Sequence, residues 1–254
     1  MTTTVHAPAE TRPAPDPMRR TARAAGILYL LTFVSIPSLA LYGPVRETAD
    51  FVLGAGSHTG VLVAALSEVV VALACIGTAV VLFPVAKRVS ETAALGFVTS
   101  RVVEGALIIV GVVSVLSLVT LRNDVAGTAD ADPASLVTTG HTLVATYDWT
   151  FLLSQSLAPV FNALCLGYVL YRSGLVPRVL PTIGLIGAPL LLAADIAIFF
   201  GVFDRTGPIA LAALPIAVWE FSLGVYLTVK GFKPSAVAAL PSAAGDRKSE
   251  LSPA

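Results

Sequence analysis

The sequence predicts an all-α fold, a polytopic transmembrane helical bundle of six spans with both termini in the cytoplasm. Apolar residues make up 56% of the 254 residues, whereas Asp, Glu, Lys and Arg together make up 13%. That charged share is about half of what soluble domains carry, and a soluble fold of this length needs more charge to cover its surface. Long apolar segments alternate with short charged ones. Most of the protein surface should therefore face lipid.

Six segments have the length that a membrane span requires. A hydrocarbon core of about 30 Å is crossed by about 20 apolar residues in helical form. Strands are disfavoured because lipid offers no partner to an open sheet edge, and because the segments lack the alternation of barrel strands. The predicted spans lie at or within residues 24–41, 60–85, 93–121, 146–171, 179–200 and 209–229.

The distribution of basic residues predicts the orientation, because Lys and Arg favour the cytoplasmic side of a membrane. One set of alternate loops, with the two tails, holds twelve of them: Arg12, Arg19, Arg20, Arg23, Lys87, Arg88, Arg172, Arg178, Lys230, Lys233, Arg247 and Lys248. The other set holds only Arg46, Arg122 and Arg205. Both termini are therefore expected inside, and the expected location is the plasma membrane, the inner membrane of a bacterium.

The two ends of the chain are predicted to be disordered tails around a membrane domain of residues 19–230. Residues 1–18 are rich in Thr, Ala and Pro and lack apolar periodicity, and residues 231–254 form the second, cytoplasmic tail. Met18 is an alternative start of the protein. The basic residues 19–23, the apolar run and Ser38-Leu39-Ala40 are also typical of a cleavable secretory signal, whose removal would leave five spans.

The longest external connection is predicted to run from Arg122 to about Thr146. Within it, residues 135–144 are expected to form a short interfacial helix. Tyr147 and Trp149 follow and are expected in the aromatic belt at the outer face. Pro37 and Pro215 are expected to kink the first and sixth helices.

Charged residues inside the predicted spans are the main candidates for function. A charge at membrane depth costs about 2.5–3.5 kcal/mol on insertion scales, so such residues usually face the interior of the bundle. The candidates are Glu68, Arg101, Glu104, Asp195 and Glu220. Arg101 and Glu104 are three residues apart and can pair on one helical face. Arg101 could instead snorkel to the cytoplasmic surface or hold an anionic ligand group.

The fourth span carries a polar stripe. Asp148, Gln155 and Asn162 are seven residues apart and would share one face of a regular helix. Such a stripe either forms interhelical hydrogen bonds or makes one wall of a polar cavity. The predicted ligand-binding set is Arg101, Glu104, Gln155, Asn162 and Glu220, with Glu68, Asp148 and Asp195 as secondary candidates.

Motifs for catalysis, metal or cofactor binding are missing from the sequence. His6, His58 and His141 are far apart, and no spacing of metal ligands or phosphate-binding loop is present. Cys75 and Cys165 lie in apolar runs, as buried thiols do. The formal net charge of zero gives no indication of a nucleic-acid partner. No catalytic residue, metal or cofactor is therefore predicted, and the expected partners are membrane lipids and a small-molecule ligand.

Three short motifs are similar to a known family. The segment GYVLYRSGLVPRVL at 167–180 closely resembles the characteristic turn of the bacterial membrane-protein family called domain of unknown function 4386. RAAGILYL at 23–30 and RVVE at 101–104 resemble its opening and third-helix motifs, although Pro181 replaces a usual Gly. The resemblance implies a polytopic bacterial membrane protein, and it supplies no reaction. Because it includes the first segment, it favours retention of that segment over cleavage.

The turn motif also has a physical interpretation. Arg172 and Arg178 should lie at the inner lipid headgroups. Gly174 is suited to a left-handed helix cap, and Pro177 is suited to open the next helix.

Three functions are compatible with these features. The leading hypothesis is a transporter-like or accessory protein that binds a small molecule or lipid in a polar pocket within the membrane. An intramembrane enzyme with Glu68, Asp195 or Glu220 as acid or base is an alternative. A structural or regulatory partner of another membrane protein is the third, and it would use the small residues Gly184 and Gly187 as a contact face.

Overall fold

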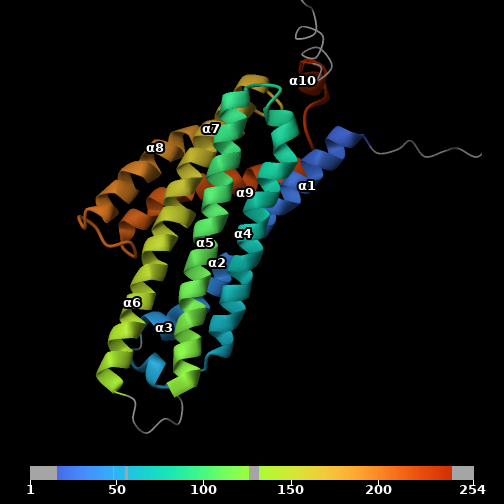
Figure 1. The fold of residues 1–254 in the computed structure, drawn as a ribbon. Coiled ribbons are helices and arrows are strands. Elements are labelled where there is room, and N and C mark those ends of the chain that lie inside the picture. The colour runs from blue at the N-terminus through green and yellow to red at the C-terminus, as the bar shows by residue number, and fades with distance from the viewer. Residues whose placement is uncertain (1–15, 48, 55–56, 126–131, 242–254) are drawn as a thin grey trace, which may run out of the picture.

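The computed structural model describes residues 16–47, 49–54, 57–125 and 132–241 (Figure 1). Regular structure within these residues is helical throughout, and six helical stretches are long and apolar enough to cross a membrane. The predicted fold class, an all-α bundle with six candidate spans, is therefore confirmed. The disorder predicted for residues 1–15 and 242–254 lies outside the described residues.

The first predicted span falls within the stretch Pro17–Val45, which changes from a regular α-helix to tighter helical turns along its length. α1 (Pro17–Leu31) begins at an Asp16 cap and ends in tight turns, with the Thr32 hydroxyl donating to the Tyr29 carbonyl at 2.7 Å. Pro37 lacks the amide hydrogen that a continuing helix needs. Short helical pieces follow: α2 (Ser35–Ser38), η1 (Leu39–Tyr42), α3 (Gly43–Glu47) and η2 (Ala49–Leu53). The irregular part of the first span thus begins at Thr32–Val34, a few residues before the Pro37 at which a kink was predicted.

α4 (Thr59–Ala86) and α5 (Glu91–Val125) form a long hairpin at the centre of the bundle (Figure 1). Their backbones approach closely at Gly105, where an added Cβ would lie 3.0 Å from the Ala72 carbonyl oxygen. α1 packs against α4 on one side of this hairpin, and α7 packs against α5 on the other.

The fourth span is much longer than predicted. α6 (Pro133–Phe151), a π-helical turn (Leu152–Leu157, η3) and α7 (Ala158–Ser173) form one helix of 41 residues. The separate interfacial helix expected at 135–144 is part of α6. Pro159 cannot donate an amide hydrogen to the Gln155 carbonyl, and the helix widens into a π turn just before it.

The last two spans are held together by glycine contacts. α8 (Val179–Phe199) follows a turn in which Gly174 has φ 66°, the predicted left-handed cap. η4 (Pro208–Ala213) leads into α9 (Leu214–Val229), so Pro215 stands in the first turn of α9 and does not kink it. A Cβ on Gly184 would lie 2.5 Å from the Trp219 ring, which shows how closely α8 approaches α9.

Both ends of the described chain lie at the same end of the bundle (Figure 1). α10 (Pro234–Ala238) lies beside the start of α1, and the Lys233 amide donates to the Leu175 carbonyl in the α7–α8 turn at 2.9 Å. Residues 231–241, expected to belong to a disordered tail, are thus described as a turn and a short helix on the bundle. Phe232 is buried there.

Candidate binding site

Arg101 joins two helices through charged hydrogen bonds. Its Nη2 donates to Glu220 Oε1 on α9 at 2.6 Å, and its Nη1 donates to Glu104 Oε2 on α5 at 3.1 Å. Arg101 is 0% exposed, so it does not snorkel to the membrane surface. Sequence spacing anticipated the pair on α5. The contact with Glu220, 119 residues away, is made by the tertiary fold.

Three further helices complete this charge cluster. Asn162 on α7 donates to Glu104 Oε2 at 2.6 Å, and Cys75 on α4 lies 3.5 Å from Arg101 Nη1. The Tyr29 ring on α1 faces the guanidinium, with 4.9 Å between the ring centroid and Cζ. One Arg and two Glu side chains give the cluster a formal charge of −1.

A cavity of about 180 Å³ lies against the charge cluster. Arg101, Glu104 and Glu220 form part of its wall, together with Gln155. The remaining wall is mostly apolar and comes from the first span, α4, α6, α7, α8, η4 and α9: Thr32, Phe33, Ser35, Ile36, Leu39, Val71, Phe151, Pro159, Leu191, Ala213, Ile216 and Ala217. Four of the five predicted site residues therefore line this central cavity, and Asn162 contacts it through Glu104.

Gln155 connects this site with a second polar cluster around Glu68 on α4. The Gln155 Nε2 donates to Glu68 Oε1 at 2.7 Å. The hydroxyls of Tyr42 and Tyr147 also donate to the Glu68 carboxylate, at 2.8 and 3.0 Å. Tyr147 is only 3% exposed, so its expected place in an aromatic belt is wrong, whereas Trp149 is 50% exposed. Glu68 thus ties η1, α4 and the α6–η3 helix together.

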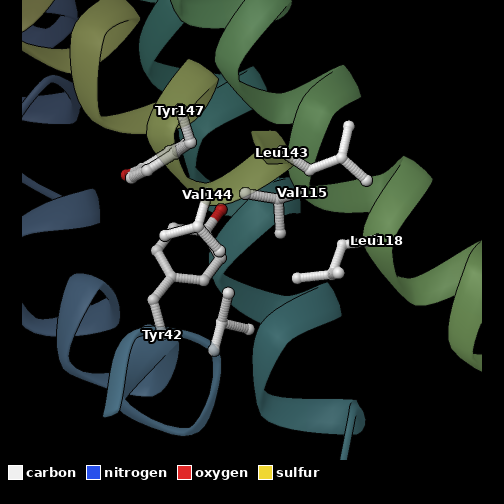
Figure 2. Close-up of a pocket in the computed structure, with 7 residues that line it drawn as sticks. Tyr42, Val115, Leu118, Leu143, Val144 and Tyr147 are labelled. Carbon is white, nitrogen blue, oxygen red and sulfur yellow. The ribbon is translucent and has the colours of Figure 1, made fainter. Parts of the chain in front are cut away.

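The two tyrosines also border a small apolar cavity (Figure 2). Its volume is about 10 Å³, and its other walls are formed by Val45, Val115, Leu118, Leu143 and Val144. The rings of Tyr42 and Tyr147 meet edge to face, with 5.2 Å between centroids. The space holds no more than about one water, so this cavity is too small for an organic ligand.

Replacing Tyr147 by Phe is expected to destabilise the protein. Glu68 would lose one of its hydrogen bonds, and a bond to a charged group contributes about 1.5–3 kcal/mol. The measurement is the unfolding free energy in detergent micelles. Tyr171→Phe is the matched control, because Tyr171 is 45% exposed, and its expected effect is below about 0.5 kcal/mol. Equal losses in both variants would contradict this role of Tyr147.

The other polar candidates lie apart from the central cavity. Ser156 donates to Asp195 Oδ1 at 2.6 Å, which joins η3 to α8. Asp148 is paired with Arg205 from the segment after α8. The shared face predicted for Asp148 and Gln155 is therefore wrong, because the π turn between them changes the rotation per residue.

Arg172 and Arg178 are exposed on either side of the α7–α8 turn. Arg172 donates to the Tyr168 hydroxyl at 3.3 Å, and Arg178 lies over the Tyr171 ring at 5.4 Å. Within the ranges that the structure describes, no group of three His, Cys, Asp or Glu side chains is placed to hold a metal.

Some residues of the site carried no signal of their own in the sequence. Thr32, Phe33 and Ser35 line the cavity where the first span passes from α1 through tight turns into α2. Pro37 was the available signal for that change of helix geometry. Tyr29 contacts Arg101 and Tyr42 donates to Glu68, but the sequence alone does not distinguish these two residues from ordinary core or interface aromatic residues.

These features define a multi-pass α-helical membrane protein with an ion cluster and a cavity inside its bundle. The chain belongs to the family described as Domain of unknown function (DUF4386), which matches residues 24–231. The resemblance carried by the three sequence motifs is thereby confirmed. Neither a curated protein nor a solved structure matches the chain.

Proposed function

We propose that this protein binds a small molecule, or one end of a lipid, in the central cavity, as a transporter-like or accessory component. The cavity of about 180 Å³ beside three charged side chains carries the proposal. A dry cavity of about 150 Å³ is enough to bind benzene, whereas drug-sized ligands occupy about 300–1,000 Å³. The volume therefore suits a compact ligand.

The change of helix geometry in the first span supports this function. Irregular helical segments commonly form substrate sites near the middle of transporters, because departures from regular helix are tolerated where the backbone borders a cavity. Here the residues between α1 and α2 and the start of α2 provide part of the cavity wall.

The two alternative functions have less support. The glycine face of α8 is occupied by α9 of the same chain, so it offers no docking surface for another protein. An enzyme would require carboxyl groups that share a site. Of the three proposed for that role, Glu220 lines the central cavity, whereas Glu68 and Asp195 do not.

Filling the cavity should prevent ligand retention. Ala217 is a half-buried residue of the cavity wall, and Trp at this position would occupy the space. Native mass spectrometry of protein extracted from its host membrane should show a bound small molecule on the wild type and not on Ala217→Trp. Val218→Trp is the matched control, since Val218 is 45% exposed on the same helix. Equal retention by all three proteins, or none by the wild type, would contradict the proposal.

We also propose that the protein lies in the plasma membrane with both termini in the cytoplasm. The basic residues of the described ends and of the α4–α5 and α7–α8 turns support this orientation. Green fluorescent protein fused to the C-terminus should fluoresce in bacterial cells, and alkaline phosphatase fused after Asp124 should be active. The opposite pattern of the two reporters would reverse the orientation.

A further inference from the structure

We infer that the ligand of the central cavity is an organic ammonium ion, one positive charge attached to a compact apolar body. This inference rests on the proposed function and specifies its ligand class. It follows from the hydrogen bonds within the charge cluster, from one carboxylate oxygen of Glu220 that accepts no hydrogen bond from the described residues, and from the chemistry of the remaining walls.

Both Nη groups of Arg101 already donate to protein acceptors, whereas its Nε is buried without an acceptor among the described residues. Its two Nη groups donate to Glu104, Glu220 and the Cys75 sulfur. Arg101 is 0% exposed, with the Tyr29 and Phe97 rings facing it at 4.9 and 5.9 Å. An anionic ligand would have to displace a carboxylate to reach either Nη group. The arrangement therefore disfavours an anion, although Arg101 is the most obvious anion-binding residue of the sequence.

Glu220 leaves acceptor capacity at the cavity wall. Its Oε1 accepts from Arg101, and its Oε2 accepts no hydrogen bond from the residues that the structure describes. The residue is only 8% exposed and lines the cavity, and Oε2 is not among the fully buried side-chain atoms that lack a partner, so this oxygen keeps some accessible surface. An ammonium group in the cavity could therefore reach Oε2 and donate a charged hydrogen bond to it.

The charge balance points the same way. Arg101 neutralises one of the two carboxylates, so the formal charge of the cluster is −1. An unbalanced charge at membrane depth is unfavourable. A ligand with a single positive charge restores neutrality, whereas an anion would raise the net charge to −2.

The other walls favour an organic cation over a metal ion. Phe33, Ile36 and Leu191 are among the apolar side chains that line the cavity. Hard metal cations require about six or more oxygen ligands, whereas both Glu104 oxygens and Glu220 Oε1 already accept hydrogen bonds from Arg101 or Asn162. Aromatic faces attract ammonium groups, and Phe33 and Phe151 both border the space. The apolar walls would surround the body of the ligand while its ammonium group contacts Glu220.

Three probes with one ring and different charge test this inference: benzylamine, benzyl alcohol and benzoate at pH 7. Their apparent affinities come from the concentration dependence of the thermal unfolding midpoint in a neutral maltoside detergent. Benzylamine is expected to bind at least about tenfold more tightly than benzyl alcohol, because close opposite charges attract strongly away from water. Benzoate is expected not to bind.

Substitutions at Glu220, Glu104 and Ala217 test which residues cause the preference for benzylamine. Glu220→Gln should remove the preference for benzylamine while retaining the Arg101–Glu104 pair, and Glu104→Gln makes the same charge change from α5 if the first variant does not fold. Ala217→Trp should abolish binding of all three probes, and Val218→Trp should leave binding unchanged.

The outcomes separate the two proposals. Equal or tighter binding of benzyl alcohol or benzoate would overturn the inferred charge of the ligand and leave the cavity as a binding site. A benzylamine preference that persists in both glutamine variants would also overturn the inference. If no probe binds the wild type while mass spectrometry still finds a retained molecule, only the inferred ligand class fails. If neither is observed, the proposed function fails as well.

Discussion

Replacing Arg101 by Ala is expected to lower the unfolding free energy by about 3–5 kcal/mol, the usual cost of removing one partner from a buried ion pair. The substitution would leave the Glu104 and Glu220 carboxylates facing the vacated space without a cation. It would also remove a side chain that contacts the Tyr29 ring and the Cys75 sulfur. The unfolding free energy from denaturant titration in detergent micelles measures this loss.

A neutral replacement of the cluster provides the control. In the triple variant Arg101→Met, Glu104→Gln and Glu220→Gln, no charge remains to be left unpaired, so most of the stability should return. Arg178→Ala removes an exposed arginine and should change the free energy by less than about 0.5 kcal/mol. A small effect of Arg101→Ala, similar to that of Arg178→Ala, would show that the charge cluster does not hold α5 to α9.

Gly26→Ala is expected to produce the second large effect, by forcing α1 away from α9. A Cβ at Gly26 would lie 2.6 Å from the Thr228 amide nitrogen and 2.7 Å from the Gly224 carbonyl oxygen. Backbone atoms cannot rotate aside as a side chain can. Overpacking costs about 1–3 kcal/mol or more, and the upper part of that range should outweigh the helix-propensity gain of about 1 kcal/mol.

The same substitution should disturb the binding site. Thr32 and Phe33 directly follow α1, and Ile216 and Glu220 lie on α9, so separating these helices changes the cavity between them. Gly60→Ala is the matched control, because a Cβ there meets Leu41 only at an ordinary distance of 3.6 Å. Equal thermal midpoints for the two variants would contradict the close approach of α1 and α9.

The membrane class and the candidate charges could be predicted from sequence because both depend on local properties. A span is a run of apolar residues of a given length, whatever it packs against. Glu68, Arg101, Glu104, Asp195 and Glu220 stood out because lipid penalises charge. The pair on α5 also followed from a spacing of three residues, which any regular helix brings together.

The composition of the cavity wall depended on irregularities that sequence patterns describe poorly. A regular fourth helix would place Asp148 and Gln155 on one face, but the π turn directs Asp148 to Arg205 and Gln155 to Glu68. Pro37 signalled a bend in the first span without indicating that Thr32, Phe33, Ser35 and Ile36 would border a cavity. Small departures from helical geometry rotate every side chain beyond them.

The sequence by itself therefore determined that this protein crosses a membrane about six times and that its intramembrane charges face inward, because the cost of exposing polar groups to lipid applies at each position separately. Only the tertiary structure decided that Arg101 meets Glu220 from 119 residues away and that a cavity adjoins them. Those contacts depend on the rotation and separation of several helices at once. Close helix contacts at glycine residues, the π turn in the fourth span and the tight turns after α1 set that rotation and separation.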